Sequence, residues 1–178
     1  MSAEAGASAM YARLFARDLA VVAALASLWW LASGASAGAG PLADLSGLVA
    51  GVALGVCALP LHEWGHFAGA AATRSAMRPA EGLRRVFAFS FDSRANSLRQ
   101  FLAMTFGGWA GTAAAVWVAY AVLPPELLAT RVARGMALLS VLLVVVTEIP
   151  LLARAFWTGR IPPVETAGPH PGTGAPAA

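Results

Sequence analysis

Charge is scarce in this sequence. Charged residues make up only 12% of the 178 residues, about half the share of roughly 25% that is usual in soluble domains. Lysine is absent, so all twelve basic residues are arginine, and no dense basic stripe favours DNA or RNA as a partner. Apolar residues reach 58%, and the mean hydropathy is +0.67. This composition is typical of an integral membrane protein whose surroundings are a lipid bilayer.

Cysteine and histidine are also rare. The single Cys57 excludes an internal disulfide, and its apolar neighbours predict a small buried side chain. Two of the three histidines lie in one short segment, whereas His170 lies in a Pro/Gly-rich tail. We expect no specific role for His170.

Four apolar stretches are near the length of about 20 residues that a helix needs to cross a bilayer. They predict an all-α integral membrane protein with about four transmembrane helices, near residues 15–33, 42–71, 98–123 and 132–157. The first stretch, with arginines before it, also fits a cleaved secretory signal. We expect an uncleaved helix there, because the topology closes well with it.

The remaining segments divide the chain. Residues 1–14 are expected to be a mobile N-terminus, residues 15–157 one membrane-embedded domain, and residues 158–178 a disordered tail. Within the polar stretch that follows the second helix, residues 85–91 (RVFAFSF) alternate enough to predict a short strand or hairpin against the membrane. Ser97 and Gln100, at the spacing of a capping box, mark the start of the third helix.

Arginines predict the orientation of the bundle. They precede the first helix, occupy residues 73–97 and flank the end of the fourth helix, whereas the loop after the first helix has none. The positive-inside rule therefore places both termini in the cytoplasm, in a membrane of the bacterial inner-membrane type. Arg131 and Arg134, in the predicted outer loop, are the exceptions.

Residues 62–66 read His-Glu-Trp-Gly-His, the pattern H-E-x-x-H. On a helix, His62 and His66 share a face, so both imidazoles can reach one metal ion. Zinc accepts neutral histidine nitrogens and activates a water molecule, from which Glu63 can take a proton as general base. A pair of buried structural histidines is the alternative. Ionisable groups within a membrane are costly and tend to be functional, which favours the metal site.

This motif resembles that of the site-2 protease type of intramembrane zinc metalloprotease, which carries H-E-x-G-H on a membrane helix. The segment HEWGHFAGA matches it, including Gly65. In FGGWAG, Gly107 and Gly111 have the spacing of the glycine-rich element on the family's next core helix. They would line a substrate groove or allow close helix packing. The resemblance covers about residues 42–157, so the first helix would be an addition to a three-helix core.

The third metal ligand departs from the family. Its members supply an aspartate from an Asn-x-x-Pro…Asp-Gly segment, whereas here Thr147 and Pro150 keep the spacing and no aspartate follows. Glu148, within the same apolar run, is the candidate third ligand. It could instead be a protonated carboxyl bonded to a neighbouring helix, or serve another catalytic role. Asp92 is a rival ligand, although its flanks indicate a turn, and Asp44 lies too far away.

Depth along the helices supports Glu148. At about 1.5 Å per residue, His66 and Glu148 both lie roughly 9–12 Å before the cytoplasmic arginines of their helices. Gly107 falls at a similar depth on the helix that runs the other way. Features from three helices are thus predicted to share one layer.

Together these features predict an intramembrane zinc endopeptidase that hydrolyses peptide bonds in or near transmembrane segments of other proteins. The alternative is a catalytically inactive relative that binds membrane partners, although an intact Glu63 argues against it. A membrane oxygenase or haem protein fits poorly, because the chain has one histidine cluster and both histidines lie on one helix face. Nothing in the sequence indicates the oligomeric state.

Overall fold

The computed structural model of the chain describes residues 3–35, 38 and 40–162. The described elements are almost all helical, and a small two-stranded sheet is the exception. In chain order they are α1 (Ala3–Ala35), α2 (Pro41–Val56), α3 (Ala58–Ala72), β1 (Met77–Pro79), β2 (Phe89–Phe91), α4 (Leu98–Trp117), the π-helical turn η1 (Val118–Val122) and α5 (Leu128–Thr158).

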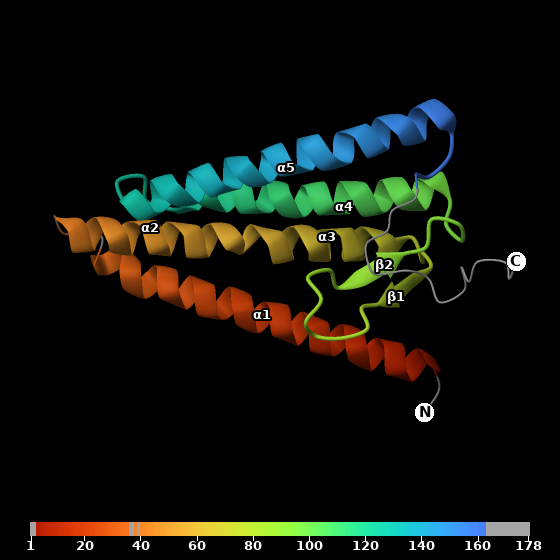
Figure 1. The fold of residues 1–178 in the computed structure, drawn as a ribbon, viewed down its shortest axis with the longest axis horizontal. Helices are drawn as coiled ribbons and strands as arrows, with labels where there is room; N and C mark the ends of the chain where they lie inside the picture. Colours follow the sequence, from red (N-terminus) through yellow and green to blue (C-terminus); the bar gives the residue numbers. More distant parts are fainter. Residues whose placement is uncertain (1–2, 36–37, 39, 163–178) are drawn as a thin grey trace, which may run out of the picture.

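Four helical rods lie roughly side by side (Figure 1), with α2 and α3 following one another in one rod. Each rod is long and apolar enough to cross a membrane, so the predicted number of helices is confirmed. The first rod is longer than expected, since it begins at Ala3 rather than near residue 15, and Leu14 is fully buried. Residues 163–178 of the predicted tail, including His170, lie outside the described residues.

The second rod is interrupted at Cys57, between α2 and α3. Pro60 has no N–H, so the carbonyl of Val56, four residues earlier, cannot receive its usual helical hydrogen bond. The Cys57 N–H instead donates to the Leu54 carbonyl at 3.1 Å, which tightens the turn. The H-E-x-x-H segment therefore lies on its own helix, α3, directly after the break.

Glycines allow α3 and α4 to approach backbone to backbone. Gly65 and Gly69 on α3 face α4, and Gly107 and Gly111 on α4 face α3. A Cβ at Gly65 would clash with the Gly107 carbonyl oxygen, and a Cβ at Gly107 would clash with that of Gly65. Small residues at four-residue spacing are the usual means of close helix packing in membranes.

A hairpin joins α3 to α4. Its strands pair antiparallel with Arg78 opposite Ser90, and Phe89 and Phe91 are buried against the helices. The predicted capping box is confirmed, because the Ser97 side chain accepts from the Gln100 N–H and the Gln100 side chain accepts from the Ser97 N–H. The hairpin lies at the end of the bundle where α3 ends and α4 begins (Figure 1).

Arg134, one of the two exceptions to the charge pattern, has a structural role. Its guanidinium donates to the carbonyls of Ala119 and Tyr120, at 2.9 and 3.4 Å, and its Cζ lies 5.0 Å from the centre of the Tyr120 ring. These carbonyls belong to η1, where the regular α-helical hydrogen bonding is lost. Arg131 similarly donates to the Glu126 carbonyl at 3.1 Å.

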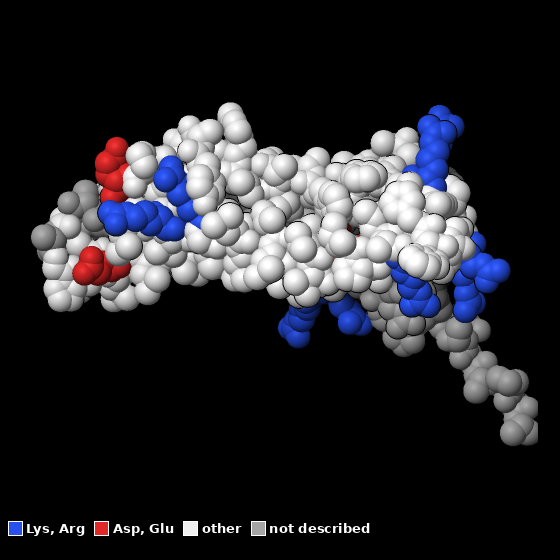
Figure 2. All heavy atoms as spheres, turned by 90° about the horizontal axis from the view of Figure 1, so that it is seen from above, with Lys and Arg blue, Asp and Glu red and all other residues white. Residues whose placement is uncertain are grey.

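Few charged side chains are exposed along the middle of α2, α4 and α5. On the face in Figure 2, arginines mark the half in which α1 begins and α5 ends, whereas acidic and basic side chains occur together at the opposite end. Large apolar side chains are exposed along the helices between, especially on α5, including Leu138, Leu142, Val145 and Val146. Such a surface is suited to lipid contact.

Candidate metal centre

Three side chains from two helices converge, two from the first half and the middle of α3 and one from the carboxyl half of α5. The Nε2 atoms of His62 and His66 lie 2.9 Å apart. Glu148 Oε1 lies 2.9 Å from His62 Nε2 and 3.3 Å from His66 Nε2. The described part of the chain thus brings together the three residues predicted as ligands, in a group that could hold a metal ion.

Helix α4 fixes how both imidazole rings are turned. His66 Nδ1 lies 2.9 Å from the Met104 carbonyl oxygen, and His62 Nδ1 lies 3.0 Å from that of Gly108 and 2.8 Å from Thr112 Oγ1. Because a carbonyl oxygen can only accept, each Nδ1 carries the hydrogen, which leaves the lone pair of a neutral ring on Nε2. This outer hydrogen bond is what a metal-binding histidine usually makes.

The centre of the triangle needs a positive charge. Two Nε2 lone pairs and one carboxylate oxygen face each other, and none of the three atoms can donate when the imidazoles are neutral. Zinc binds histidine nitrogen and carboxylate oxygen at about 2.0–2.2 Å in tetrahedral sites, which places neighbouring ligand atoms roughly 3.3–3.6 Å apart. The observed separations of 2.9–3.3 Å lie at or a few tenths of an ångström below that range. The residues therefore fit a metal ion with three protein ligands and one open position.

The second oxygen of Glu148 is also held. Trp109 on α4 donates its Nε1 hydrogen to Glu148 Oε2 at 2.8 Å. The carboxylate therefore has one oxygen fixed by the indole and the other directed at the histidines. Glu148 therefore bonds to a neighbouring helix, which was one of the alternatives for it, and it also takes its place in the triangle.

Glu63 lies beside the triangle and not within it. Its Oε1 accepts a hydrogen bond from the backbone N–H of Ala88 at 2.9 Å, so the hairpin loop contacts it. The side chain nevertheless lines the same cavity as His62, His66 and Glu148. The Glu63 carboxylate therefore borders the same space as the three predicted ligands.

The cavity at the triangle is large enough for a short extended stretch of peptide. Its volume is about 320 Å³, and its other walls are mostly apolar, formed by Phe87, Phe89, Phe101, Met104, Thr105, Thr147 and Leu151. A smaller cavity of about 140 Å³ meets it at His62, Thr147 and Glu148, and lies toward Ala58 and Ser140. The triangle therefore stands between two hollows, one bounded by the hairpin and one between the helices.

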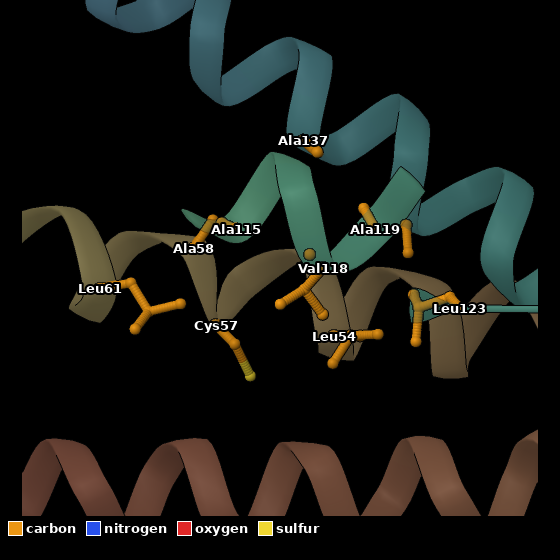
Figure 3. A pocket seen from close by; sticks show the side chains of 11 residues that line it. Leu54, Cys57, Ala58, Leu61, Ala115, Val118, Ala119, Leu123 and Ala137 are labelled. Atoms are coloured by element: carbon orange, nitrogen blue, oxygen red, sulfur yellow. The ribbon is translucent and has the colours of Figure 1, made fainter. Parts of the chain in front are cut away.

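A further cavity, of about 70 Å³, lies between α2, η1 and α5 (Figure 3). Leu54, Cys57, Val118 and Leu123 are among the side chains around it, and none of its lining residues is histidine or acidic. Cys57 is buried there, as expected, and its Sγ lies 3.6 Å from the Ala53 carbonyl oxygen. Apart from the single Cys57 thiol, this cavity offers no side-chain metal ligand.

The rival ligands lie elsewhere. Asp92 Oδ1 accepts from the N–H groups of Arg94 and Ala95, at 2.9 and 3.2 Å, which is the side-chain turn that its flanks indicated. Asp44 is in the first turn of α2, near the opposite end of the molecule. Gly107 and Gly111 lie in the α3–α4 crossing and are not among the residues that line the cavity, so the packing interpretation has direct support.

Sequence reasoning missed several residues that hold the site in place. Trp109 and Thr112 bond directly to Glu148 and His62, and Asp18 on α1 accepts from Trp64 Nε1 at 2.8 Å. Asp18 had a usable signal, because an acidic residue within an apolar run is costly. Trp109 and Thr112 had none beyond their place on the helix after the motif.

Fold and site define a helical chain with four potential membrane spans and a candidate metal centre of two histidines and a glutamate. No protein-family model matches the chain, and no curated protein or solved structure matches it. The resemblance to site-2 proteases thus stays a prediction from the motif, and the function is inferred from the site itself.

Proposed function

We propose that this protein is an intramembrane zinc metalloendopeptidase of the site-2 protease type. The single observation that carries the proposal is the convergence of His62, His66 and Glu148, with Glu63 beside them in one cavity. The zinc-binding and proton-transfer groups of a metallopeptidase are thereby present on one side of α3. Glu148 takes the place of the aspartate that the family supplies.

The four rods are proposed to span the membrane, with both termini and the hairpin on the cytoplasmic side. The length and apolar composition of the rods support this placement, as does the excess of arginine at the end of the bundle where α5 ends (Figure 2). The metal centre then lies within the membrane, toward the cytoplasmic face. Transmembrane segments of other proteins are the substrates that can reach such a site.

Each residue has a defined task in hydrolysis. His62, His66 and Glu148 would hold the zinc ion, which would supply Lewis acidity that lowers the pKa of water to near neutral. Glu63 would act as the general base that takes a proton from the attacking water, and then as the acid that gives it to the leaving amine. The hydrogen-bonding partners on α4, two carbonyls that accept from the Nδ1–H groups and the Trp109 indole that donates to Glu148, keep both Nε2 atoms and Glu148 Oε1 directed inward. No reorientation is therefore needed during the reaction.

The apolar walls of the cavity indicate which kind of substrate would bind there. A helical peptide bond is shielded by its own hydrogen bonds, so the substrate must locally unwind before Glu63 and the ligands can act on it. Phe87, Phe89 and Leu151 can contact the side chains of an apolar stretch once it is extended. We infer a substrate with an apolar segment that unwinds readily.

The test is Glu63→Gln, compared with wild type in proteoliposomes that carry a reporter with a cleavable transmembrane segment. The amide is close in shape but cannot take a proton, so zinc should be retained while cleavage falls by at least about 100-fold. Glu81→Gln, in the hairpin loop, is the matched control and should cleave at the wild-type rate. Wild-type cleavage by the Glu63→Gln variant would contradict the mechanism. A zinc-loaded wild type that cleaves no membrane reporter would favour the inactive relative.

A further inference from the structure

A buried acid on α1 lies outside the metal centre. Asp18 is only 9% exposed, and it lies at the middle of the long, largely apolar helix α1. Its Oδ2 accepts from Trp64 Nε1 at 2.8 Å, and its Oδ1 accepts from Arg17 Nε at 2.7 Å. Trp64 is the residue after Glu63, so Asp18 is bonded directly to the H-E-x-x-H segment.

Arg17 extends this network to the hairpin. Its guanidinium donates to the carbonyls of Leu83 and Arg85, at 2.7 and 2.6 Å, in the loop between the strands. Figure 1 shows this loop reaching α1. The same loop ends at Ala88, whose N–H donates to Glu63.

These contacts form a closed ring of α1, the loop and α3. Arg17 is hydrogen-bonded to the loop, and the loop is hydrogen-bonded through Ala88 to Glu63. The next residue on α3, Trp64, is hydrogen-bonded to Asp18, which is hydrogen-bonded to Arg17. Phe87, next to Ala88, forms part of the cavity wall. The ring therefore holds both the Glu63 carboxylate and one wall of the cavity. α1 itself supplies neither a metal ligand nor a cavity residue.

We propose that Arg17 and Asp18 are positioning residues for Glu63 and for the hairpin wall of the substrate cavity. They touch neither the metal ligands nor the cavity, and act through Trp64 and the loop. This assigns a task to α1 within the proposed peptidase, and it rests on that proposed function. A charged pair with several directional hydrogen bonds is suited to fixing a loop, because each bond also restricts orientation.

The first test compares Arg17→Gln, Arg17→Lys and the control Arg13→Gln, each purified with zinc. The probe is a peptide reporter with one apolar transmembrane segment, in vesicles of phosphatidylethanolamine and phosphatidylglycerol. Displacement of the general base without contact to the substrate should lower kcat by about 10–100-fold, with KM changed less and zinc retained. Arg17→Lys keeps a cation that can reach the carbonyls and should recover part of kcat, while Arg13 is exposed on the same helix and its variant should match wild type.

A second readout needs no catalysis. Arg84 and Arg85 lie in the loop and are exposed, so trypsin can cut there. Release of the loop should speed cleavage at these two sites in Arg17→Gln, relative to cleavage at Arg94, and Arg13→Gln should not change it. Unchanged trypsin cleavage together with unchanged kcat would overturn the proposal. A wild type that cleaves no reporter defeats the proposed function and the positioning role together, whereas faster trypsin cleavage would still show that Arg17 holds the loop.

A double-mutant cycle distinguishes loss of this hydrogen-bonded ring from a general loss of folding. Trp64→Phe keeps the ring contacts to Phe15 and Phe67, whose centroids lie at 5.0 and 5.1 Å, and removes only the N–H donor to Asp18. If the ring acts as a unit, Arg17→Gln and Trp64→Phe together should lower kcat little more than Arg17→Gln alone. Fully multiplicative effects would show two independent contributions and overturn the closed-ring account.

Discussion

The metal centre depends on the orientation of a few side-chain atoms. Two imidazoles at four-residue spacing can lie on one helix face without their Nε2 atoms meeting. Here they meet because α4 offers the Met104 and Gly108 carbonyls, also four residues apart, to the two Nδ1 atoms. Trp109, also on α4, donates the hydrogen bond that orients the carboxylate of Glu148. One helix thus supplies the hydrogen-bonding partners of all three proposed ligands.

Loss of the Trp109 donor should weaken zinc binding. Trp109→Phe preserves an aromatic ring but leaves Glu148 Oε2 without its 2.8 Å hydrogen bond. Removal of such outer partners typically costs about 10–100-fold in metal affinity. Competition with a fluorescent zinc chelator in detergent measures the change.

Trp117→Phe is the matched control for this prediction. Trp117 ends α4 and is 63% exposed, so its replacement should leave zinc affinity unchanged. Equal zinc affinity in Trp109→Phe and wild type would show that the indole does not orient Glu148.

At the scale of helices, the α3–α4 crossing determines whether the hydrogen bonds of the site can form. The Nδ1 contacts to backbone carbonyls require the two helix axes to be close, and the glycines at 65, 69, 107 and 111 permit this. A Cβ at Gly108 would even overlap the His66 ring. The glycines therefore support the candidate metal centre, although none of them lines its cavity.

Gly107→Ala should destabilise the helix bundle and move α4 away from the histidines on α3. The added Cβ meets backbone atoms of α3, which cannot rotate away, and such overpacking typically costs about 1–3 kcal/mol. Unfolding in a titration with sodium dodecyl sulfate measures the free energy. The control is Gly135→Ala on α5, where a Cβ would meet nothing within 4 Å. Equal free energies of unfolding for the two variants would contradict the packing account.

Much of this element-level structure could be predicted from the sequence, and the reasons are physical. Apolar length predicted the four rods, alternation in RVFAFSF predicted a strand within the hairpin, and Ser97 with Gln100 predicted a helix start. The π-turn η1 and its carbonyl contacts to Arg134 could not be predicted, because they depend on how α4 meets α5. Arg134 was consequently interpreted only as an exception in the charge pattern.

At the scale of the whole molecule, residues far apart in sequence share one layer. His62 and Glu148 are 86 positions apart, yet their side chains are 2.9 Å apart. Counting residues from the arginines near the helix ends predicted this shared depth, since helices have a fixed rise. It could not predict which neighbour would hold Glu148, nor that α1 would reach the hairpin through Arg17, because those contacts depend on rotation about the helix axes.

The most direct measurement of the central claim is zinc stoichiometry in detergent-purified protein, comparing wild type with His66→Ala and Glu148→Ala. Circular dichroism on each sample checks that the helices are intact. A three-ligand site predicts about one zinc ion per chain in wild type and its loss in both variants. Zinc that remains at the wild-type level in Glu148→Ala, or a wild type that binds none when zinc is supplied, would contradict the account.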